Sequence, residues 1–257
     1  MANAGLDQSQ CGSVFSVTGT ATPSPGDAIS STTWSVFSGT ATITSPSLAT
    51  SNITVTGSSA TLRYTVNTIR GCTVYDDVVL EVLTPPTANA GSDVIINCTN
   101  PSTTLTASGG VSYSWSPATG LSATNIANPV ATPTTTTTYT VTVTGANGCT
   151  KTDDVTVTVD KALPSANAGS DVTINCITPS TTLGASGGVS YSWSPAAGLS
   201  ATNIANPVAT PTTTTTYTVT VTGANGCTKT DDVIVTVDKA LPSANAGSDV
   251  TINCTTP

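Results

Sequence analysis

The sequence contains little charge and no histidine. Asp, Glu, Lys and Arg make up 8% of its 257 residues, and six basic against fourteen acidic side chains give a formal net charge of -8. A protein that binds nucleic acid neutralises phosphates with basic side chains, so this composition argues against nucleic acid as a partner. Without histidine, the chain also lacks the base that activates Ser–His and Cys–His nucleophiles. We therefore expect no enzymatic activity.

Large apolar side chains are scarce as well. Aromatic residues make up 4% of the sequence and Met1 is the one methionine. No apolar run reaches the 18 residues that indicate a membrane span, and no basic region with an apolar segment follows Met1, so we expect neither a span nor a signal peptide. Val, Ile and Thr are abundant instead. These β-branched residues favour strands and are uncommon in disordered chains.

Internal repeats organise the chain. The motif "ANAGSD" occurs at Ala88, Ala166 and Ala244, a period of 78 residues, and the two units that begin at Ala88 and Ala166 differ at six positions. A more distant copy begins with "ANAGLD" at Ala2. Such a period predicts separate structural units. We expect a divergent repeat, two near-identical repeats and the truncated start of a further one, at residues 1–85, 86–163, 164–241 and 242–257.

Each repeat contains short runs in which apolar and polar residues alternate, such as "DVIINC", "VSYSWS", "TTYTVTVT" and "DVTVTV". A period of two, with turn residues between the runs, predicts an all-β chain of tandem Ig-like antiparallel β-sandwich domains. Asn147-Gly148 is expected to form a tight hairpin turn. Of the six differences between the near-identical repeats, three fall on the outward side of this pattern and three in predicted turns. The tryptophans are expected in the cores: Trp34, Trp115 and Trp193.

Seven cysteines in a chain with so few large apolar residues indicate an oxidising compartment and a secreted protein. Two pairings are open. Pairing within repeats gives Cys11–Cys72, Cys98–Cys149 and Cys176–Cys227, with Cys254 unpaired; pairing across junctions gives Cys72–Cys98, Cys149–Cys176 and Cys227–Cys254, with Cys11 unpaired. The count does not separate them. We favour the first, because each repeat then carries its own crosslink, although a hairpin tip and the far end of a first strand are not obvious neighbours.

Acidic residues gather at two places in each repeat, within "ANAGxD" and at the start of the last strand. Calcium is bound by carboxylates and carbonyls in loops, so a junctional calcium site is one interpretation; the chain is expected to hold no other cofactor. The candidate ligands are Asp93, Asp153, Asp154, Asp171, Asp231 and Asp232. The alternative is a solvated acidic pair that protects a strand edge. Adjacent aspartates in a strand point to opposite faces, which disfavours the carboxylate pair of a glycosidase.

The run Thr134–Thr138 is repeated 78 residues later. It has three interpretations: the beginning of a strand stiffened by β-branched side chains, a glycosylated stalk, or an ordered threonine array. We favour the first, because the run continues directly into an alternating segment.

The motifs "ANAGSD", "SYSWSP" and "TTTYTVTVTGANGCT" resemble the PKD-like and Ig-like tandem repeats of very large cell-surface proteins of Bacteroidetes, most closely the SprB-type gliding-motility adhesins. The resemblance covers nearly the whole chain. It implies export by the type IX secretion system and display as a long filament on the outer cell surface. The sequence has "YSWSPATGLS" where PKD domains carry "WDFGDG", so the calcium-binding residues of PKD domains are not carried over to this chain.

Repeats and resemblance together predict a structural and adhesive segment of a secreted filament. The β-sandwiches would form an extended rod that spaces a binding tip from the cell and links it mechanically. The alternatives are an array of glycan-binding modules and an ice- or mineral-binding surface. The expected partners are neighbouring repeats of the same chain, surface polysaccharide, and other adhesin or motility-machinery proteins.

Overall fold

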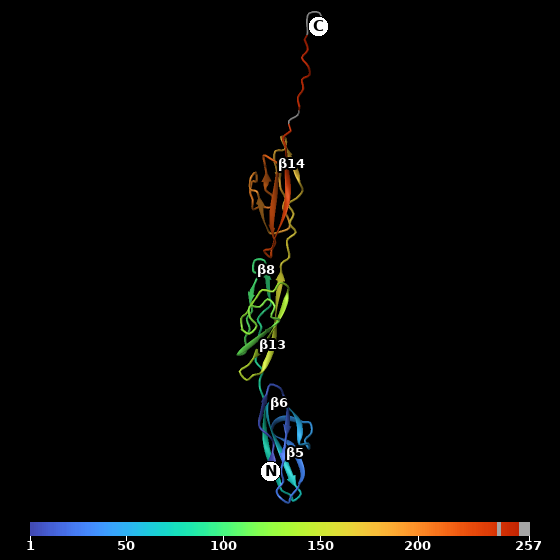
Figure 1. Ribbon diagram of the computed structural model, residues 1–257, viewed down its shortest axis with the longest axis vertical. Helices are drawn as coiled ribbons and strands as arrows, with labels where there is room; N and C mark the ends of the chain where they lie inside the picture. Colours follow the sequence, from blue (N-terminus) through green and yellow to red (C-terminus); the bar gives the residue numbers. More distant parts are fainter. Residues whose placement is uncertain (241–242, 252–257) are drawn as a thin grey trace. The chain divides into compact units, whose positions relative to one another are not determined.

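The computed structural model describes residues 1–240 and 243–251, and all regular elements within them are β-strands (Figure 1). The first repeat contains β1 (Ala2–Asn3), β2 (Gln8–Gln10), β3 (Val14–Thr18), β4 (Thr20–Ala21), β5 (Ile29–Ile43), β6 (Thr50–Thr68) and β7 (Thr73–Val82). The second contains β8 (Val94–Asn97), β9 (Thr103–Thr104), β10 (Ser112–Ser116), β11 (Val130–Ala131), β12 (Thr137–Thr144) and β13 (Thr150–Asp160). The third contains β14 (Val172–Asn175), β15 (Thr181–Thr182), β16 (Ser190–Ser194), β17 (Val208–Ala209), β18 (Thr215–Thr222) and β19 (Thr228–Asp238).

The chain divides into two compact units. One consists of Met1–Ile95 and Ser102–Val159, and the other of Ile96–Pro101 and Asp160–Pro257. The first unit thus holds the first repeat and most of the second, while a short segment from the second repeat belongs to the unit of the third. No helix in the described part of the chain is long and apolar enough to cross a membrane.

Each repeat is built on one larger and one smaller sheet. In the first repeat the larger sheet has the order β2-β7-β6-β3, with β5 also paired to β6 (Figure 1), and β1 pairs with β4. In the second and third repeats the larger sheets have the orders β10-β12-β13-β8 and β16-β18-β19-β14. The smaller sheets are β9–β11 and β15–β17. This all-β arrangement is that of Ig-like sandwich repeats.

The first strand of the larger sheet, the opening strand, lies beside the last strand, the closing strand. β2 pairs with β7 and β14 pairs with β19, both in parallel, and β8 is the neighbour of β13 in the same position of its sheet. The predicted antiparallel Ig-like sandwich is confirmed for the long strands, and the short opening strands are the exception. Alternation did not reveal this, because it reports which side chains are buried and not the direction of the partner strand. Parallel pairing places the C-terminal ends of both strands at the same end of the repeat.

The alternating residues of the long strands fill the cores. In the third repeat, Tyr217, Val219 and Val221 of β18 pack in one buried cluster with Trp193 and with residues of the smaller sheet such as Ala209. Their counterparts in β12 are buried in the same way, so the predicted inward phase is correct. The isoleucines that distinguish the two near-identical repeats are all exposed: Ile95, Ile177 and Ile234.

The three tryptophans are buried, and their polar ends are satisfied. The exposed fraction is 1% for Trp34 and 3% for both Trp115 and Trp193. The indole N–H of Trp115 donates to the carbonyl of Ile126 at 2.9 Å, and that of Trp193 donates to the corresponding carbonyl in the third repeat. A buried indole needs such a partner.

A buried tyrosine ties the second strand of each near-identical sheet to a loop. The hydroxyl of Tyr139 donates to the carbonyl of Thr119, and that of Tyr217 donates to the carbonyl of Ala197, both at 2.8 Å. Burial raises the pKa of both tyrosines, because the phenolate would lose its hydration.

We expect stability to fall above about pH 10, the ordinary pKa of tyrosine. The unfolded chain ionises there first, so the folded state binds more protons and loses stability as the pH rises. Replacing Tyr139 and Tyr217 with Phe should cost about 1 kcal/mol per site at pH 8 and should reduce the further loss between pH 8 and pH 11. Urea unfolding across this range measures both effects. An unchanged pH dependence in the double variant would contradict this role of the tyrosines.

Candidate functional site

The turn before each closing strand is the same in all three repeats. In the second repeat Gly145 N donates to Cys149 O at 2.8 Å and Gly148 N donates to Gly145 O at 3.0 Å. The equivalent pairs are Thr68–Cys72 and Gly71–Thr68 in the first repeat and Gly223–Cys227 and Gly226–Gly223 in the third. Gly148 has φ +80°, a conformation that favours glycine. Asn147 does not share it, so the predicted tight Asn-Gly turn is replaced by a longer one.

These turns present one set of cysteines, the turn cysteines Cys72, Cys149 and Cys227. A second set, the opening-strand cysteines Cys11, Cys98 and Cys176, directly follows β2, β8 and β14. Because β2 and β7 run in parallel, Cys11 lies where the closing strand of its repeat ends. The backbone N–H of Leu83, just after β7, donates to Gln10 O at 2.7 Å.

A disulfide joins Cys11 of the first repeat to Cys149 of the second, with 5.5 Å between their Cα atoms. The turn of the second repeat also contacts the segment that connects the two repeats. Asn147 Nδ2 donates to Thr84 O at 2.9 Å, while its Oδ1 accepts from Cys149 N at 3.1 Å. The junction is thus closed by one covalent bond and by a side chain that holds the turn and the connecting segment together.

The second disulfide repeats this arrangement one unit further along. Cys98 is bonded to Cys227, with Cα atoms 5.0 Å apart, and Cys98 N donates to Asn225 O at 3.2 Å. Asn225 Nδ2 donates to Ala162 O at 2.9 Å and to Asp160 Oδ1 at 2.8 Å. The opening-strand cysteine of one repeat therefore pairs with the turn cysteine of the next.

Neither pairing expected from the sequence is present. Cys11 and Cys149 are 138 residues apart and Cys98 and Cys227 are 129 apart, and both expected schemes used shorter separations. The reason is the parallel strand pair, which carries each opening-strand cysteine to the end of its repeat. Among the described residues, Cys72 and Cys176 are exposed and free. Cys254, for which no partner was expected within a repeat, lies outside the described residues.

We expect peptide mapping of the unreduced protein to recover Cys11–Cys149 and Cys98–Cys227 as linked peptides. Replacing Cys98 with Ser should leave Cys227 free and lower the stability by about 5 kcal/mol in the chain-entropy model, because the closed loop is long. Chemical unfolding and thiol titration measure both effects. The matched control is Cys176→Ser, which should leave the stability unchanged and lower the number of free thiols by one. Recovery of a Cys98–Cys149 peptide would contradict this connectivity.

The acidic residues clamp the start of each repeat to its closing strand. Asp153 Oδ2 accepts from Ala90 N at 2.8 Å, and Asp93 Oδ1 accepts from Thr156 N at 2.8 Å. The same two bonds occur in the other repeats. In the first repeat, Asp76 accepts from Ala4 N and Asp7 accepts from Val79 N. In the third, Asp231 accepts from Ala168 N and Asp171 accepts from Ile234 N. Each carboxylate satisfies a backbone donor that would otherwise have no strand partner.

These contacts favour a structural role for the aspartates over the calcium interpretation. Within residues 1–240 and 243–251, no three or more Asp, Glu, His or Cys side chains gather in a way that could hold a metal ion. Asp153 and Asp93 are engaged with backbone N–H groups, and Asp154 points to the opposite face of the strand and is exposed. In the third repeat, Asp231 and Asp171 are likewise engaged with backbone N–H groups, and Asp232 is exposed on the opposite face of the strand.

We expect the variant Asp153→Ala with Asp231→Ala to lose about 1–2 kcal/mol per repeat, the cost of a charge-assisted hydrogen bond at a partly buried site. The neighbouring pair Asp154→Ala with Asp232→Ala is the matched control and should stay within about 0.5 kcal/mol of the parent. Thermal unfolding with and without a chelator completes the test. A chelator that lowers the unfolding temperature of the parent protein would restore the calcium interpretation.

The threonine run leads into a strand. β12 begins at Thr137, and Thr136 Oγ1 accepts from Val159 N at 3.1 Å, so the run attaches to the closing strand. The outward side of β12 then carries Thr138, Thr140, Thr142 and Thr144, beside the outward serines of β10. Thr138 and Thr156 share a hydroxyl hydrogen bond of 3.1 Å across the strands. We call this outward surface of β10, β12 and β13 the hydroxyl face.

The first repeat has a cluster that the sequence analysis did not identify. The guanidinium carbon of Arg63 lies 4.0 Å from the ring centre of Phe37 and 3.8 Å from that of Tyr75. Arg63 also donates two hydrogen bonds of 2.8 Å to Asp77, and these hold the pKa of that carboxyl below its ordinary value. The sequence does contain one indication of this cluster: Tyr75 and Asp77 are two residues apart in one strand and therefore point to the same outward face.

No family model matches the sequence, and no curated protein matches it. Among solved structures, the chain is similar to the titin I-band fragment I67–I69, with 12% identity, a TM-score of 0.39, and coverage of 93% of this chain and 98% of that one. It is also similar to repeats EC22–24 of mouse cadherin-23, at 13% identity and a TM-score of 0.34 over 91% and 94% of the chains. Drosophila OTK domains 3–5 show 9% identity and a TM-score of 0.33 over 91% and 94%.

Proposed function

We propose that the chain is a structural and adhesive repeat segment of a secreted cell-surface filament, which spaces a binding tip from the cell and links the two mechanically. The observation that carries the proposal is the pair of disulfides, each of which bonds one repeat to the next. A disulfide within a repeat would stabilise only that repeat. A disulfide between repeats resists their separation, and this is the property that a load-bearing spacer needs.

The order of the bonded cysteines adds to this support. Along the chain the cysteines follow as Cys11, Cys98, Cys149 and Cys227, so the two disulfide-closed loops overlap. When the chain is pulled from its ends, the shortest covalent path runs from Cys11 to Cys149, back to Cys98, and on to Cys227. Most of the first and third repeats lies off this path and cannot be extended while the disulfides are intact.

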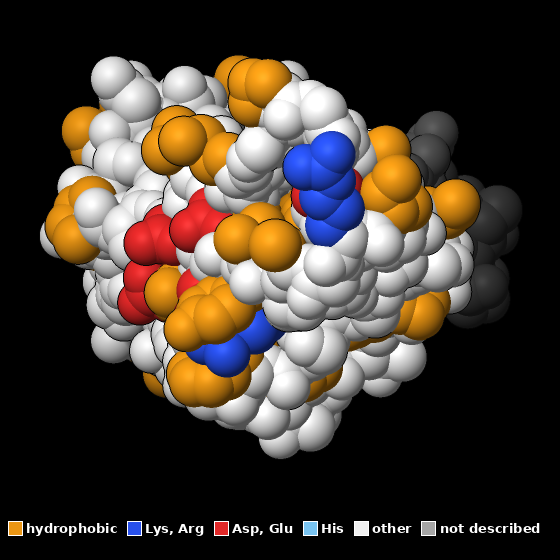
Figure 2. Space-filling model, turned by 90° about the horizontal axis from the view of Figure 1, so that it is seen from below, with side chains coloured by type: hydrophobic (Ala, Val, Ile, Leu, Met, Phe, Trp, Pro, Cys, Tyr) orange, Lys and Arg blue, Asp and Glu red, His pale blue; other side chains and the backbone are white. Residues whose placement is uncertain are grey.

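The surface and the chemistry fit an extracellular location. Disulfides persist in oxidising compartments, and the face in Figure 2 carries few charged side chains among many uncharged ones. The resemblance of the repeat motifs to gliding-motility adhesins extends the proposal to a filament exported by type IX secretion and displayed on the outer cell surface. Its partners would be neighbouring repeats of the same chain, surface polysaccharide and motility-machinery proteins.

A glycan-binding array has weaker support. Sugar-binding sites use the flat face of an exposed aromatic ring. The exposed rings of the first repeat, Phe37 and Tyr75, each have one face covered by the guanidinium of Arg63. The hydroxyl face remains as a polar surface for weak contacts with polysaccharide, and it fits an adhesive role within the same filament.

Single-molecule stretching of the chain from its two ends tests the proposal. In the oxidised protein we expect the extension to come mainly from the segment between Cys98 and Cys149. After reduction, each unfolding repeat should release on the order of 250 Å of chain, at about 3.5 Å per residue. The variant Cys98→Ser, which keeps Cys11–Cys149, should show an intermediate extension. Equal extensions before and after reduction would rule out a load-bearing role for the disulfides.

A further inference from the structure

Asn-Gly occurs twice in the sequence, as Asn147-Gly148 and Asn225-Gly226, and both copies lie in the turn before a closing strand. This dipeptide is especially prone to deamidation, because glycine has no side chain to hinder the attack of its backbone nitrogen on the asparagine amide carbon. The two copies share the sequence "GANGCTKTDDV". Their intrinsic reactivity is therefore the same, and a difference between them in the folded protein comes from their surroundings.

Both asparagines are held in a way that opposes this attack. The side-chain oxygen accepts from the N–H of the cysteine two positions on, at 3.1 Å in both turns. The side-chain nitrogen donates at 2.9 Å to a carbonyl of the connecting segment, which is Thr84 O for one turn and Ala162 O for the other. The glycine nitrogen, which is the nucleophile, donates to the first carbonyl of the turn at 3.0 Å. These bonds have to break before the glycine nitrogen can reach the amide carbon.

The two junctions hold their turns to different degrees. We call the one closed by Cys11–Cys149 the first junction and the one closed by Cys98–Cys227 the second. In the second junction, Asn225 Nδ2 also donates to Asp160 Oδ1 at 2.8 Å. The connecting segment of the first junction, "VLTPPT" at residues 82–87, has no acidic residue. Asn147 therefore lacks the charge-assisted hydrogen bond that Asn225 makes.

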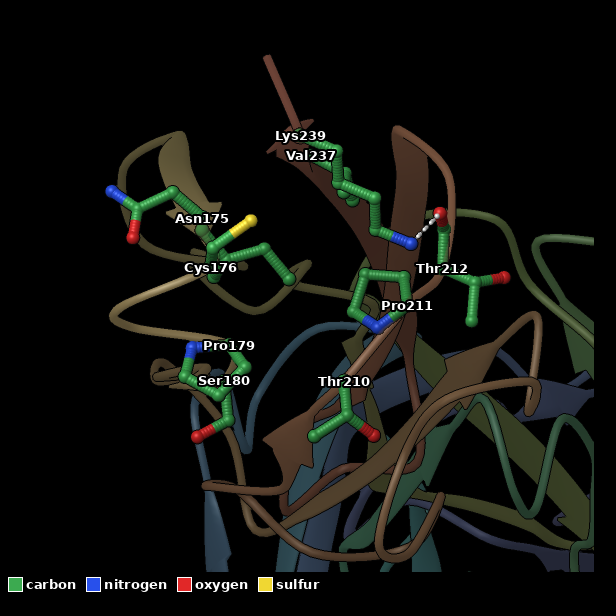
Figure 3. A pocket seen from close by; sticks show the side chains of 10 residues that line it. Asn175, Cys176, Pro179, Ser180, Thr210, Pro211, Thr212, Val237 and Lys239 are labelled. Atoms are coloured by element: carbon green, nitrogen blue, oxygen red, sulfur yellow. Dashed lines mark hydrogen bonds between the residues drawn. The ribbon is translucent and has the colours of Figure 1, made fainter. Parts of the chain in front are cut away.

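The end of the second repeat covers the second turn. Cys98 N donates to Asn225 O at 3.2 Å, and a Cβ atom at Gly226 would collide with the side chain of Thr99. Figure 3 shows the same surface at the end of the third repeat, where Cys176, the counterpart of Cys98, lines a groove of about 440 Å³. Every residue that lines this groove has an identical counterpart 78 positions earlier. A turn held against such a surface has little room to rearrange.

The first turn is more open. Gly12 follows its cysteine as Thr99 follows Cys98, and glycine has no side chain to cover the turn. A Cβ atom at Gly148 would meet no atom within 4 Å. Asn147 is exposed, whereas Asn225 is half-buried. The first Asn-Gly pair is thus the less protected of two chemically identical sites.

We infer that Asn147 is a deamidation site whose reactivity is controlled by the first junction. While the junction is closed, the bonds to Thr84 O and from Cys149 N hold the amide away from the glycine nitrogen. When the junction opens, through load or through reduction of its disulfide, these bonds are lost and the site reacts. The inference goes beyond the proposed function, which concerns load along the chain and would stand without any deamidation.

The reaction needs only water as a co-reactant. The backbone nitrogen of Gly148 gives its proton to a solvent base and attacks Cγ of Asn147. The bond from Cγ to Nδ2 then breaks, so that ammonia leaves and a five-membered succinimide remains. Water opens this ring at either of its carbonyl carbons and gives aspartate or isoaspartate. In total one water is consumed and one ammonia is released, with no oxidation or reduction.

The product does not fit the closed junction. A carboxylate has no N–H to donate, so Thr84 O loses its partner and faces an oxygen where it accepted a hydrogen bond. Isoaspartate also adds one carbon to the backbone of the turn that carries Cys149. A junction that has opened and reacted cannot return to its original contacts, and a transient opening becomes a permanent change.

Timed incubation of the unmodified chain in mildly alkaline buffer tests the inference, with each site followed by mass spectrometry of its peptide after quenching at low pH. In the folded, oxidised protein we expect Asn147 to deamidate about tenfold faster than Asn225, as one additional hydrogen bond to a charged group implies. In urea with a reductant, both sites should react at one common, higher rate. Equal rates in the folded protein, or no acceleration on unfolding, would overturn the inference.

Opening the first junction alone is the second test. Cys11→Ser should raise the rate at Asn147 about fivefold, as for the loss of one neutral hydrogen bond, and should leave the rate at Asn225 unchanged. The matched control is Cys72→Ser, which removes a free thiol and breaks no bond, so it should change neither rate. If Asn147 reacts no faster in Cys11→Ser than in the control, the junction does not protect it and the inference fails.

The reciprocal variant makes the second junction resemble the first. Thr99→Gly combined with Asp160→Ala removes the covering side chain and the carboxylate acceptor. We expect the rate at Asn225 to rise to about that of Asn147, which serves as the internal reference in the same sample. Peptide mapping of Cys98–Cys227 confirms that the junction is still bonded. An unchanged rate at Asn225 would show that these contacts do not set the reactivity and would overturn the inference.

Discussion

The parallel pairing of the opening and closing strands is the constraint on which the rest of the structure depends. It places the end of the first strand beside the end of the last one, as for Asn175 opposite Asp238. Whatever follows the opening strand therefore lies where the chain leaves the repeat. In this sequence a cysteine follows it, and the turn of the next repeat provides the partner. An antiparallel arrangement would carry the same cysteine to the opposite end and would favour a bond within the repeat.

The aspartate clamps supply the second condition for this arrangement. The opening strands are only three or four residues long, so their own ladder hydrogen bonds are few. Asp93 and Asp153 add two bonds between the segment that precedes β8 and the closing strand, and the other repeats have the same two. The chain has few charged residues, yet several of its carboxylates accept hydrogen bonds from backbone N–H groups. This explains why the motif "ANAGxD" recurs with each repeat.

Much of the fold could be predicted from the sequence, because alternation is a direct consequence of a sheet with one buried face. The inward phase of Tyr139, Val141 and Val143 and the outward position of Ile95 follow from it, while the repeat period follows from the recurring motif "ANAGSD". The direction of β2 and β14 could not be predicted, since parallel and antiparallel partners bury the same side chains. The disulfide pairing was wrong for that reason. The choice between a calcium site and a structural role could not be made from the sequence, because a run of carboxylates does not show whether backbone donors already occupy them. The Arg63 cluster was missed because it needs three strands in register.

The overlap of the two disulfide-closed loops has a consequence for proteolysis. A backbone cut anywhere between Cys11 and Cys227 leaves one fragment holding a cysteine whose partner is in the other, so the fragments stay joined; between Cys98 and Cys149 two bonds hold them. A protease that cleaves a connecting segment, for example after Lys161, would nick the protein without releasing the distal part. A backbone cut that would separate an ordinary tandem-domain protein into two pieces would therefore leave this protein in one piece until its disulfides are reduced.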